Sequence, residues 1–181
     1  MLSKEAIKAK NKYKKLGSMI SWLVVEPWKP VMWKVKLQRF NFDNVVGINP
    51  KSKGHKKEKL KLAGMETWKI TTPNSDPEKI LLYFHGGAYQ VGSPKGYYPM
   101  LTHLARETGF TIYIPDYRLA PEHYHPAQVE DGVATYEALV NDLGYSPDQI
   151  AFGGDSAGGN MSLVTMLKPV SYTHLTLPTK A

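Results

Sequence analysis

Runs of consecutive, mostly apolar residues mark three segments of the chain. Residues 80–84 and 110–115 form two of them, and residues 150–152 form a shorter third run before a glycine-rich turn. Apolar runs of this length, without polar alternation, are typical of strands buried on both faces of a parallel sheet. Earlier strands are predicted within residues 60–71, where 65–70 is the better candidate.

Apolar residues at helical spacing lie between these runs. Residues 98–108 and 126–143 have this spacing, and they end at Gly109 and Gly144, which fit helix C-terminal stops. Strands that alternate with helices of this length form right-handed βαβ units. We therefore expect an α/β fold with a mostly parallel sheet and flanking helices.

The first 70 residues differ from the rest in charge. They contain 17 Lys and Arg against 5 Asp and Glu, the remainder contains 6 against 11, and all four tryptophans lie in the basic part. Residues 1–16 are predicted to form a basic helix and 31–40 a second helix, with a polar loop over 41–59. The apolar stretch 19–25 is too short to span a membrane.

Two interpretations fit this basic, Trp-rich N-terminus. It is either a lid helix with a solvated Lys face and an apolar face over a site, or a helix that makes weak contact with a membrane surface. Nucleic acid binding is not expected, because no recognition motif accompanies the net charge of +7. The absence of cysteine excludes disulfides and thiolate metal sites and agrees with a cytoplasmic location. His123 and His125 lack the carboxylates that would complete a metal site.

The candidate chemistry centres on Gly-Asp-Ser-Ala-Gly-Gly, residues 154–159. A Gly-x-Ser-x-Gly between a strand and a helix is the nucleophile elbow of an α/β-hydrolase, where the serine sits on a sharp turn above the sheet. Ser156 is thus the candidate nucleophile. Gly154 and Gly158 leave room for the strand and the helix to pass closely.

A second stretch supports this interpretation. The apolar run 80–84 leads directly into His85-Gly86-Gly87, and such a loop supplies backbone N–H groups to the oxyanion of an acyl-transfer reaction. We expect Gly86, Gly87 and Ala157 as the donors. His85 is expected to brace the loop, since a base at this position would break the chain order Ser, Asp, His of the fold.

Together these motifs resemble the hormone-sensitive-lipase-type esterases, the bacterial family IV carboxylesterases of the α/β-hydrolase fold. The resemblance covers residues 69–167. The matching segments are HGGAY at 85–89, Gly92-Ser93, DYRLAPEH at 116–123, Pro126-Ala127, Glu130-Asp131 and GDSAGGN at 154–160.

The resemblance implies a function and several roles. It implies hydrolysis of small apolar esters without a cofactor or metal, and it places residues 1–45 in a helical cap over a core at 46–168. Tyr89 is expected to line the substrate pocket, and Asp116 is expected to pair with Arg118 and pin a loop. Amide or lactone hydrolysis would use the same machinery.

The end of the chain departs from this pattern. Residues 169–181 resemble a translated library adaptor and are expected to be non-native. No Asp or Glu follows Asp155, which is a motif residue beside the serine, and the only later His is His174 in that tail. The fold needs an acid and a base after the nucleophile, so we expect a truncated, inactive chain in which the strand at 149–152 is a sheet edge.

The main hypothesis is therefore a serine carboxylic ester hydrolase, represented by its N-terminal part. The alternative is a non-catalytic relative that binds a small molecule. The retained serine and oxyanion loop favour the enzyme, because binding alone does not need that pair.

Overall fold

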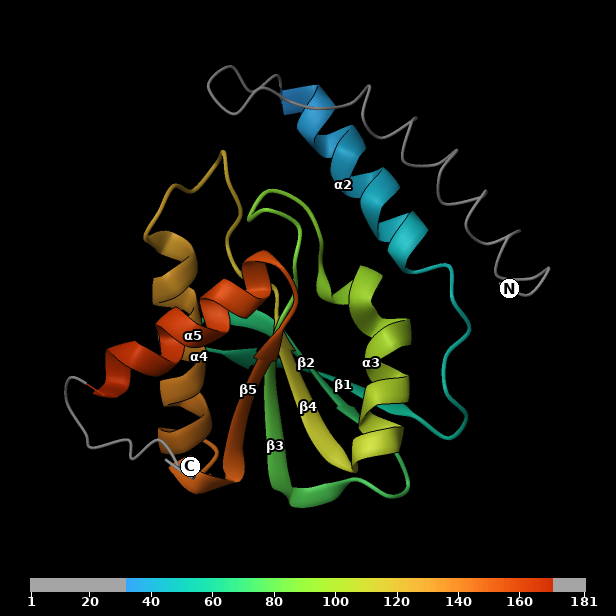
Figure 1. The fold of residues 1–181 in the computed structure, drawn as a ribbon, viewed down its shortest axis with the longest axis vertical. Coiled ribbons are helices and arrows are strands. Elements are labelled where there is room, and N and C mark those ends of the chain that lie inside the picture. The colour runs from blue at the N-terminus through green and yellow to red at the C-terminus, as the bar shows by residue number, and fades with distance from the viewer. Residues whose placement is uncertain (1–31, 171–181) are drawn as a thin grey trace, which may run out of the picture.

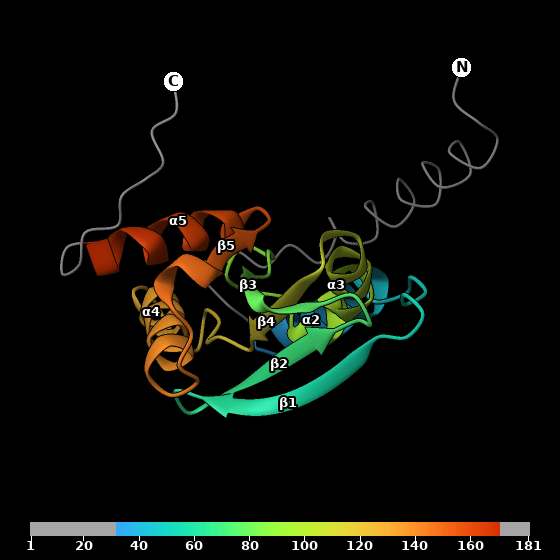
Figure 2. The same ribbon diagram turned by 90° about the horizontal axis from the view of Figure 1, so that it is seen from below.

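The computed structural model describes residues 32–170, which form a five-stranded sheet with helices on both faces (Figures 1 and 2). The elements, in chain order, are α2 (Met32–Val46), β1 (Lys56–Leu62), β2 (Met65–Thr71), β3 (Asp76–Phe84), α3 (Pro94–Thr108), β4 (Phe110–Pro115), α4 (Ala127–Asn141), the 3-10 helix η1 (Pro147–Gln149), β5 (Ile150–Gly154) and α5 (Ala157–Val170).

The sheet is mixed and has the strand order β1-β2-β4-β3-β5. Strand β3 pairs in parallel with both β4 and β5, while the β1–β2 hairpin joins β4 through antiparallel pairing. The expected α/β architecture with flanking helices is thus confirmed, although only half of the strand pairings within residues 32–170 are parallel, and the parallel part carries the candidate site. Within residues 32–170, β5 is an edge strand, as the sequence predicted.

Two apolar cores lie on opposite faces of this sheet. Ile80, Leu82 and Phe84 of β3 belong to the cluster under α4 and α5, and Tyr83 belongs to the cluster under α3. Successive side chains of a strand point to opposite faces, so an uninterrupted apolar run supplies both cores. Figure 1 shows the loops after β3 and β5 at the upper edge of the sheet, with α2 above them.

Helix α3 has clear signals at both ends. The Ser93 side chain accepts a hydrogen bond from the Gly96 N–H, Pro94 occupies the first turn, and Gly109 ends the helix in the left-handed conformation at φ 74°. The predicted stop at Gly109 is confirmed. The helix begins four residues before the predicted start, because the cap acts upstream of the apolar spacing.

Helix α2 is longer than the sequence predicted. It continues six residues past residue 40, and β1 already begins at Lys56, so the predicted loop over 41–59 is wrong at both ends. The extension is stabilised by tertiary contact. Phe42 and Val46 pack against the core under α3, and the Phe42 ring centroid lies 6.4 Å from that of Tyr97.

The expected division of the chain lies partly outside the described residues. Helix α2 begins within the predicted cap at 1–45 and ends one residue past it, at Val46, but residues 1–31 of that cap are not described. Helix α5 runs to Val170, two residues past the predicted end of the core, and residues 171–181 of the predicted tail, with His174, are not described.

Candidate active site

Ser156 occupies the sharp turn between β5 and α5. Its φ is 50°, in the left-handed region that non-glycine residues rarely adopt, and its side chain is exposed. Such strain persists only where the surroundings over-determine it. The turn therefore holds a serine hydroxyl above the carboxyl end of β5.

The glycines on either side of Ser156 allow this turn to form. A Cβ on Gly158 would lie 2.0 Å from the Phe84 carbonyl oxygen, and one on Gly154 would lie 2.4 Å from the Gly158 carbonyl carbon. No side chain fits at these distances, since real Cβ contacts begin near 3 Å. The close passage of β3, β5 and α5 is the physical reason for glycine at both positions.

The loop after β3 folds back on itself beside the elbow. The N–H groups of Gln90 and Val91 donate to the Gly87 carbonyl at 2.9 and 3.0 Å. Gly87 has φ 121°, and Ala88 has φ 54°. This conformation requires glycine at position 87 and leaves the N–H groups of Gly87 and Ala88 without an acceptor in the described part of the chain.

One of the three expected oxyanion donors, the Gly86 N–H, already has a partner in the structure. The Gly86 N–H donates to Oδ1 of Asp155 at 2.9 Å, so it is not available to a substrate. Gly87 and Ala88 remain on the loop, and the N–H of Ala157 begins α5, where no preceding turn supplies an acceptor. The sequence could not show which of the two glycine amides was already committed.

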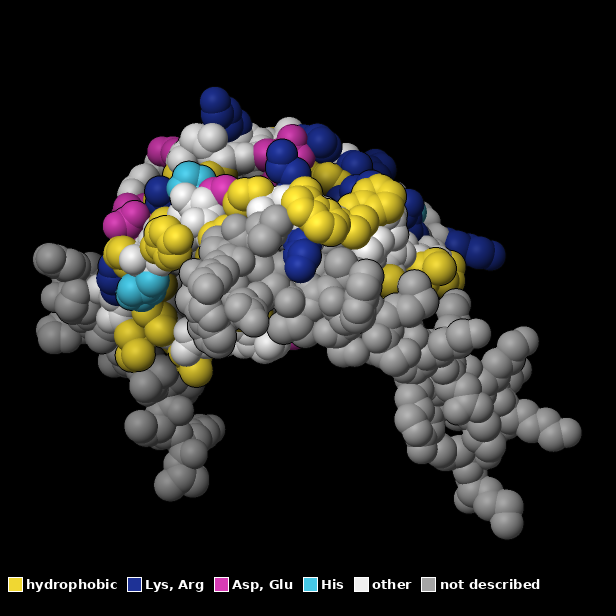
Figure 3. Space-filling model, turned by 90° about the horizontal axis from the view of Figure 1, so that it is seen from above, with side chains coloured by type: hydrophobic (Ala, Val, Ile, Leu, Met, Phe, Trp, Pro, Cys, Tyr) yellow, Lys and Arg dark blue, Asp and Glu magenta, His cyan; other side chains and the backbone are white. Residues whose placement is uncertain are grey.

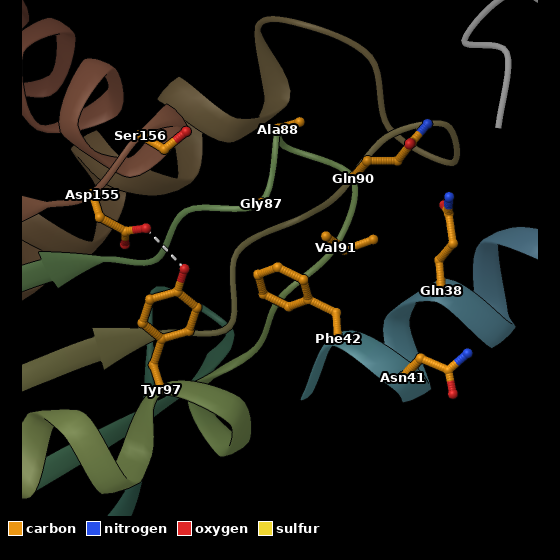
Figure 4. Close-up of a pocket in the computed structure, with 10 residues that line it drawn as sticks. All are labelled: Gln38, Asn41, Phe42, Gly87, Ala88, Gln90, Val91, Tyr97, Asp155 and Ser156. Carbon is orange, nitrogen blue, oxygen red and sulfur yellow. Dashed lines mark hydrogen bonds between the residues drawn. The ribbon is translucent and has the colours of Figure 1, made fainter. Parts of the chain in front are cut away.

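Asp155 faces this loop and holds it. Besides the Gly86 N–H, its carboxylate accepts a hydrogen bond from the Tyr97 hydroxyl at 2.9 Å (Figure 4) and another from the Tyr83 hydroxyl at 3.1 Å. Burial, and then the Asp155 charge, raise the pKa of both phenols well above their ordinary value, so both stay donors. Sequence reasoning missed the two tyrosines, because nothing local connects them to a residue 58 or more positions away.

His85 supports the loop from below. It is fully buried, its ring stacks on Tyr117 with centroids 4.3 Å apart, and its Nδ1 lies 2.8 Å from the Gly86 carbonyl oxygen. The Tyr117 hydroxyl donates to the His85 carbonyl at 2.6 Å. Burial lowers the pKa of His85 to about 4, so the ring is neutral and its Nδ1–H donates to Gly86.

A cavity of about 390 Å³ connects the elbow, the oxyanion loop and α2. Figure 4 shows Ser156 and Ala88 at one side of it, with Phe42 and Gln38 of α2 across from them. Its walls are formed by Gln38, Asn41, Phe42, Gly87, Ala88, Gln90, Val91, Tyr97, Asp155 and Ser156. Tyr89, expected in the pocket, is not among them, and its hydroxyl donates to Oδ1 of Asn160 at 2.8 Å.

Arg39 attaches α2 to the loops around the cavity. Its guanidinium donates to both carboxylate oxygens of Glu122 at 2.7 Å and to the carbonyls of Gln90 and Ala120 at 2.8 Å. A bidentate Arg–carboxylate pair has a defined orientation as well as charge attraction. Sequence reasoning missed this clamp, because its partners lie 51 to 83 positions away.

The expected pairing of Asp116 with Arg118 is wrong. Arg118 instead binds Asp131 on α4, with Nη2 2.7 Å from Oδ1, and also contacts Glu130 at 3.3 Å. Helix α4 brings these acids beside the loop, and the Arg118 N–H also donates to Asp131. The loop is thus pinned to a helix and not to its own neighbouring residue.

No described side chain hydrogen-bonds the Ser156 hydroxyl, so within residues 32–170 the candidate nucleophile lies beside free backbone N–H groups but has no candidate base in contact with it. In the same residues, no three His, Cys, Asp or Glu side chains are grouped as metal ligands.

Comparison with known proteins agrees with this geometry. A family model described as the alpha/beta hydrolase fold matches residues 81–176. The carboxylic ester hydrolase LipN of Mycobacterium tuberculosis is 38% identical over 89 residues, covering 47% of this chain and 24% of LipN. An esterase of Acinetobacter venetianus is 33% identical over 109 residues, covering 60% of this chain and 35% of that protein.

A solved structure extends the match. The crystal structure of an esterase from the bacterial hormone-sensitive lipase family is 34% identical, with a TM-score of 0.75, and the match covers 91% of this chain and 54% of that one. The chain therefore spans about a third or less of these curated relatives and about half of this solved structure.

Proposed function

The chain belongs to the α/β-hydrolase fold family, among the esterases of the hormone-sensitive-lipase type, and on this basis we propose that it carries the nucleophile and oxyanion hole of a carboxylic ester hydrolase. The observation that carries the proposal is Ser156 at φ 50° on the wall of the cavity that Gly87 and Ala88 also line. A strained serine beside unpaired backbone N–H groups is the arrangement that acyl transfer needs.

The proposed reaction has two steps. The Ser156 Oγ attacks the ester carbonyl carbon, its proton passes to a base, and the N–H groups of Gly87, Ala88 and Ala157 stabilise the oxyanion. The intermediate collapses to an acyl-enzyme when the base returns the proton to the leaving alkoxide. Water, activated by the same base, then attacks the acyl-enzyme and releases the acid and free Ser156.

The described residues do not bring the groups for the proton transfers to Ser156. No Asp or Glu follows Asp155, and the described residues contain no partner for the Ser156 hydroxyl. His85 is turned to Gly86 and does not serve as the base. We therefore propose that this chain alone does not hydrolyse esters.

The cavity supports small apolar esters as substrates. Its volume of about 390 Å³ is near the lower end of ligand pockets. Phe42 and Val91 contribute apolar walls to it. Short or medium acyl chains fit such a space, and lactones or amides of similar size would reach the same serine.

The test begins with the gene. Its sequence past the codon for Leu167 is determined, the whole reading frame is expressed, and hydrolysis of p-nitrophenyl butyrate is measured for that product and for the chain as printed. The longer product is expected to be active, and Ser156→Ala to lower its kcat by about 10⁴-fold or more. Ser162→Ala, on the same helix, is the control. An active Ser156→Ala enzyme would exclude this serine as the nucleophile.

One observation favours a second candidate function, a small-molecule binding module. The described residues form a cavity with apolar walls, whereas no base for Ser156 is among them. If the reading frame ends as printed, this alternative is the better one. It predicts that an apolar ester binds the chain in calorimetry, is recovered unchanged, and binds Ser156→Ala equally well.

A further inference from the structure

Helix α2 has apolar residues on two opposite faces. Phe42 packs against the core, and Val35, seven residues before it and so on the same face of the helix, is fully buried. Trp33, Leu37 and Phe40, spaced four and three residues apart, lie on the other face and are 62%, 39% and 65% exposed. A surface helix of a globular protein needs one apolar stripe, so the second stripe is not explained by packing within residues 32–170.

The outer stripe lies beside a group of positive charges. Lys34 and Lys36 flank it on the helix, and Ile48, 63% exposed, follows the helix end. Figure 3 shows hydrophobic side chains next to Lys and Arg side chains on the face that carries α2. Large exposed apolar side chains that gather in one patch indicate an interaction surface.

The positive charge continues into a groove of about 440 Å³ at the end of α2. Asn44, one turn after Phe40, lines it together with Lys51, Lys57 and Lys59. Lys51 and Lys57 lie over aromatic rings, with the Lys57 Nζ 4.1 Å from the Trp68 centroid and 5.3 Å from that of Tyr98. These contacts orient the ammonium groups without neutralising them.

The carboxylates on this side do not balance the lysines. Glu66 is paired with Lys59 at 2.9 Å, and Asp43 accepts a hydrogen bond from Ser93. Within the described residues, Lys34, Lys36, Lys51 and Lys57 have no carboxylate partner. The face therefore combines protruding aromatic residues with excess positive charge.

We infer that this face of α2 docks on an anionic phospholipid surface. Trp33, Leu37 and Phe40 enter the boundary between headgroups and acyl chains, and the flanking lysines contact lipid phosphates. Amphipathic helices with aromatic residues on one side and lysines around them bind membranes in this way, about 5–10 Å deep. No helix within residues 32–170 is long and apolar enough to cross a membrane.

The inner face of α2 connects the proposed lipid contact with the candidate active site. Gln38, Asn41 and Phe42 line the cavity that contains Ser156, so docking holds the cavity about one helix diameter, roughly 10 Å, from the lipid. Apolar esters concentrate in that layer. This connection depends on the proposed ester hydrolase function, but the docking itself does not.

The experiment is co-sedimentation of the full chain with sucrose-loaded vesicles. Vesicles of phosphatidylcholine are compared with vesicles that also contain about 30 mol% phosphatidylglycerol, at about 0.05 M and 0.5 M salt. Binding is expected on the anionic vesicles at low salt. The variant Trp33→Ser/Phe40→Ser should reduce the partition coefficient at least about tenfold. Lys34→Gln/Lys36→Gln should weaken binding and reduce its salt dependence.

A matched control distinguishes binding through this face of α2 from nonspecific hydrophobic binding to the vesicles. Leu163→Ser/Leu167→Ser removes two side chains from α5 that are 60% and 63% exposed, and it should leave vesicle binding within about twofold. Ser156→Ala should also bind vesicles unchanged, which keeps this test independent of catalysis. Circular dichroism and sedimentation without vesicles show that each variant is folded and not aggregated.

Three outcomes would overturn the inference. The first is no binding of the unmodified chain to anionic vesicles. The second is binding that the Trp33→Ser/Phe40→Ser variant retains, which would place the lipid contact elsewhere in the chain. The third is a dimer in analytical ultracentrifugation that this variant abolishes, without lipid binding, which would make a second copy of the chain the occupant.

Discussion

The two walls of the cavity are built in different ways. The wall formed by the elbow and the oxyanion loop has its backbones in contact, with no space for a Cβ at Gly154 or Gly158. Beneath it, Asp155 accepts three hydrogen bonds from groups that are each buried or half-buried. The opposite wall is helix α2, which is joined to the loops by Arg39 and by the hydrogen bond from Ser93 to Asp43, and to α3 by side-chain packing.

The two walls of the cavity serve different requirements of the proposed reaction. Acyl transfer needs N–H donors placed to a fraction of an ångström, which buried backbone contacts and a shared carboxylate provide. Substrate admission needs a wall that adapts to different acyl groups, and a helix held through surface groups moves at lower free-energy cost. If this interpretation holds, changes in the elbow wall should destabilise the whole fold, whereas changes at α2 should affect that helix alone.

The largest effect is expected at Gly158. Gly158→Ala places a Cβ 2.0 Å from the Phe84 carbonyl oxygen, a backbone atom that cannot move aside, and should lower the free energy of unfolding by about 3 kcal/mol or more. Urea denaturation followed by circular dichroism measures it. Gly159→Ala, the next residue on α5, meets its nearest atom at 3.4 Å and should be neutral or slightly stabilising. Equal effects at both positions would contradict the rigid-wall interpretation.

A pH-dependent loss of stability is expected from His85. Its pKa of about 4 in the folded chain lies below the ordinary value of 6.5, so the unfolded chain binds more protons between these two values. The stability that the neutral His85 ring provides is complete above pH 6.5 and is lost as the pH falls toward 4. At pH 5 the free energy of unfolding should be lower by about 2 kcal/mol for this reason.

The variant His85→Asn isolates this contribution. It removes the titrating ring while leaving an amide donor, so its free energy of unfolding should change less between pH 7.5 and pH 5 than that of the unmodified chain. The difference between the two slopes, measured by urea titration at both pH values, is the quantity predicted. Identical slopes would show that His85 is protonated without cost in the folded chain.

A smaller effect is expected at the carboxylate under the loop. Tyr97→Phe removes the 2.9 Å hydrogen bond to Asp155 and should cost about 1.5 kcal/mol of stability. The adjacent Tyr98 offers a control of identical chemistry, because its hydroxyl has no hydrogen bond within the described residues. Tyr98→Phe should therefore change stability by less than about 0.5 kcal/mol. A larger loss for Tyr98→Phe than for Tyr97→Phe would contradict this account of the elbow wall.

The smallest global effect is expected where α2 is clamped. Arg39→Ala should lower the free energy of unfolding by only about 1 kcal/mol, because the Arg39–Glu122 pair is partly exposed. Hydrogen exchange of the α2 amides should nevertheless accelerate by about tenfold, while amides of β3 and β5 keep their rates.

Lys36→Ala on the same helix is the control for this loss of charge and side-chain length. It lacks an ion pair within the described residues and should leave α2 exchange unchanged. If Arg39→Ala instead accelerated exchange in β3 and β5 as much as in α2, the two walls would open as one unit, and the contrast between them would be lost.

The sequence by itself determined the parts that depend on local chemistry. The apolar run at 80–84 predicted a buried strand, and Gly109 predicted a helix end, because both signals lie within a few residues of the structure that they specify. The motif around Ser156 predicted a strand–turn–helix for the same reason. A sharp turn between a strand and a helix requires small residues at fixed spacing wherever the turn lies in a protein.

Only the tertiary structure decided which hydrogen-bonding groups already have a partner within the protein, and which residues from different segments come into contact. The Gly86 N–H is committed to Asp155, Arg118 pairs with α4, and Arg39 reaches loops 51 to 83 residues away. These contacts join residues 13 to 83 positions apart, so no local pattern specifies the partner. Helix α2 shows the same limit, because its last turns are stabilised by packing against α3, which only the folded chain brings beside it.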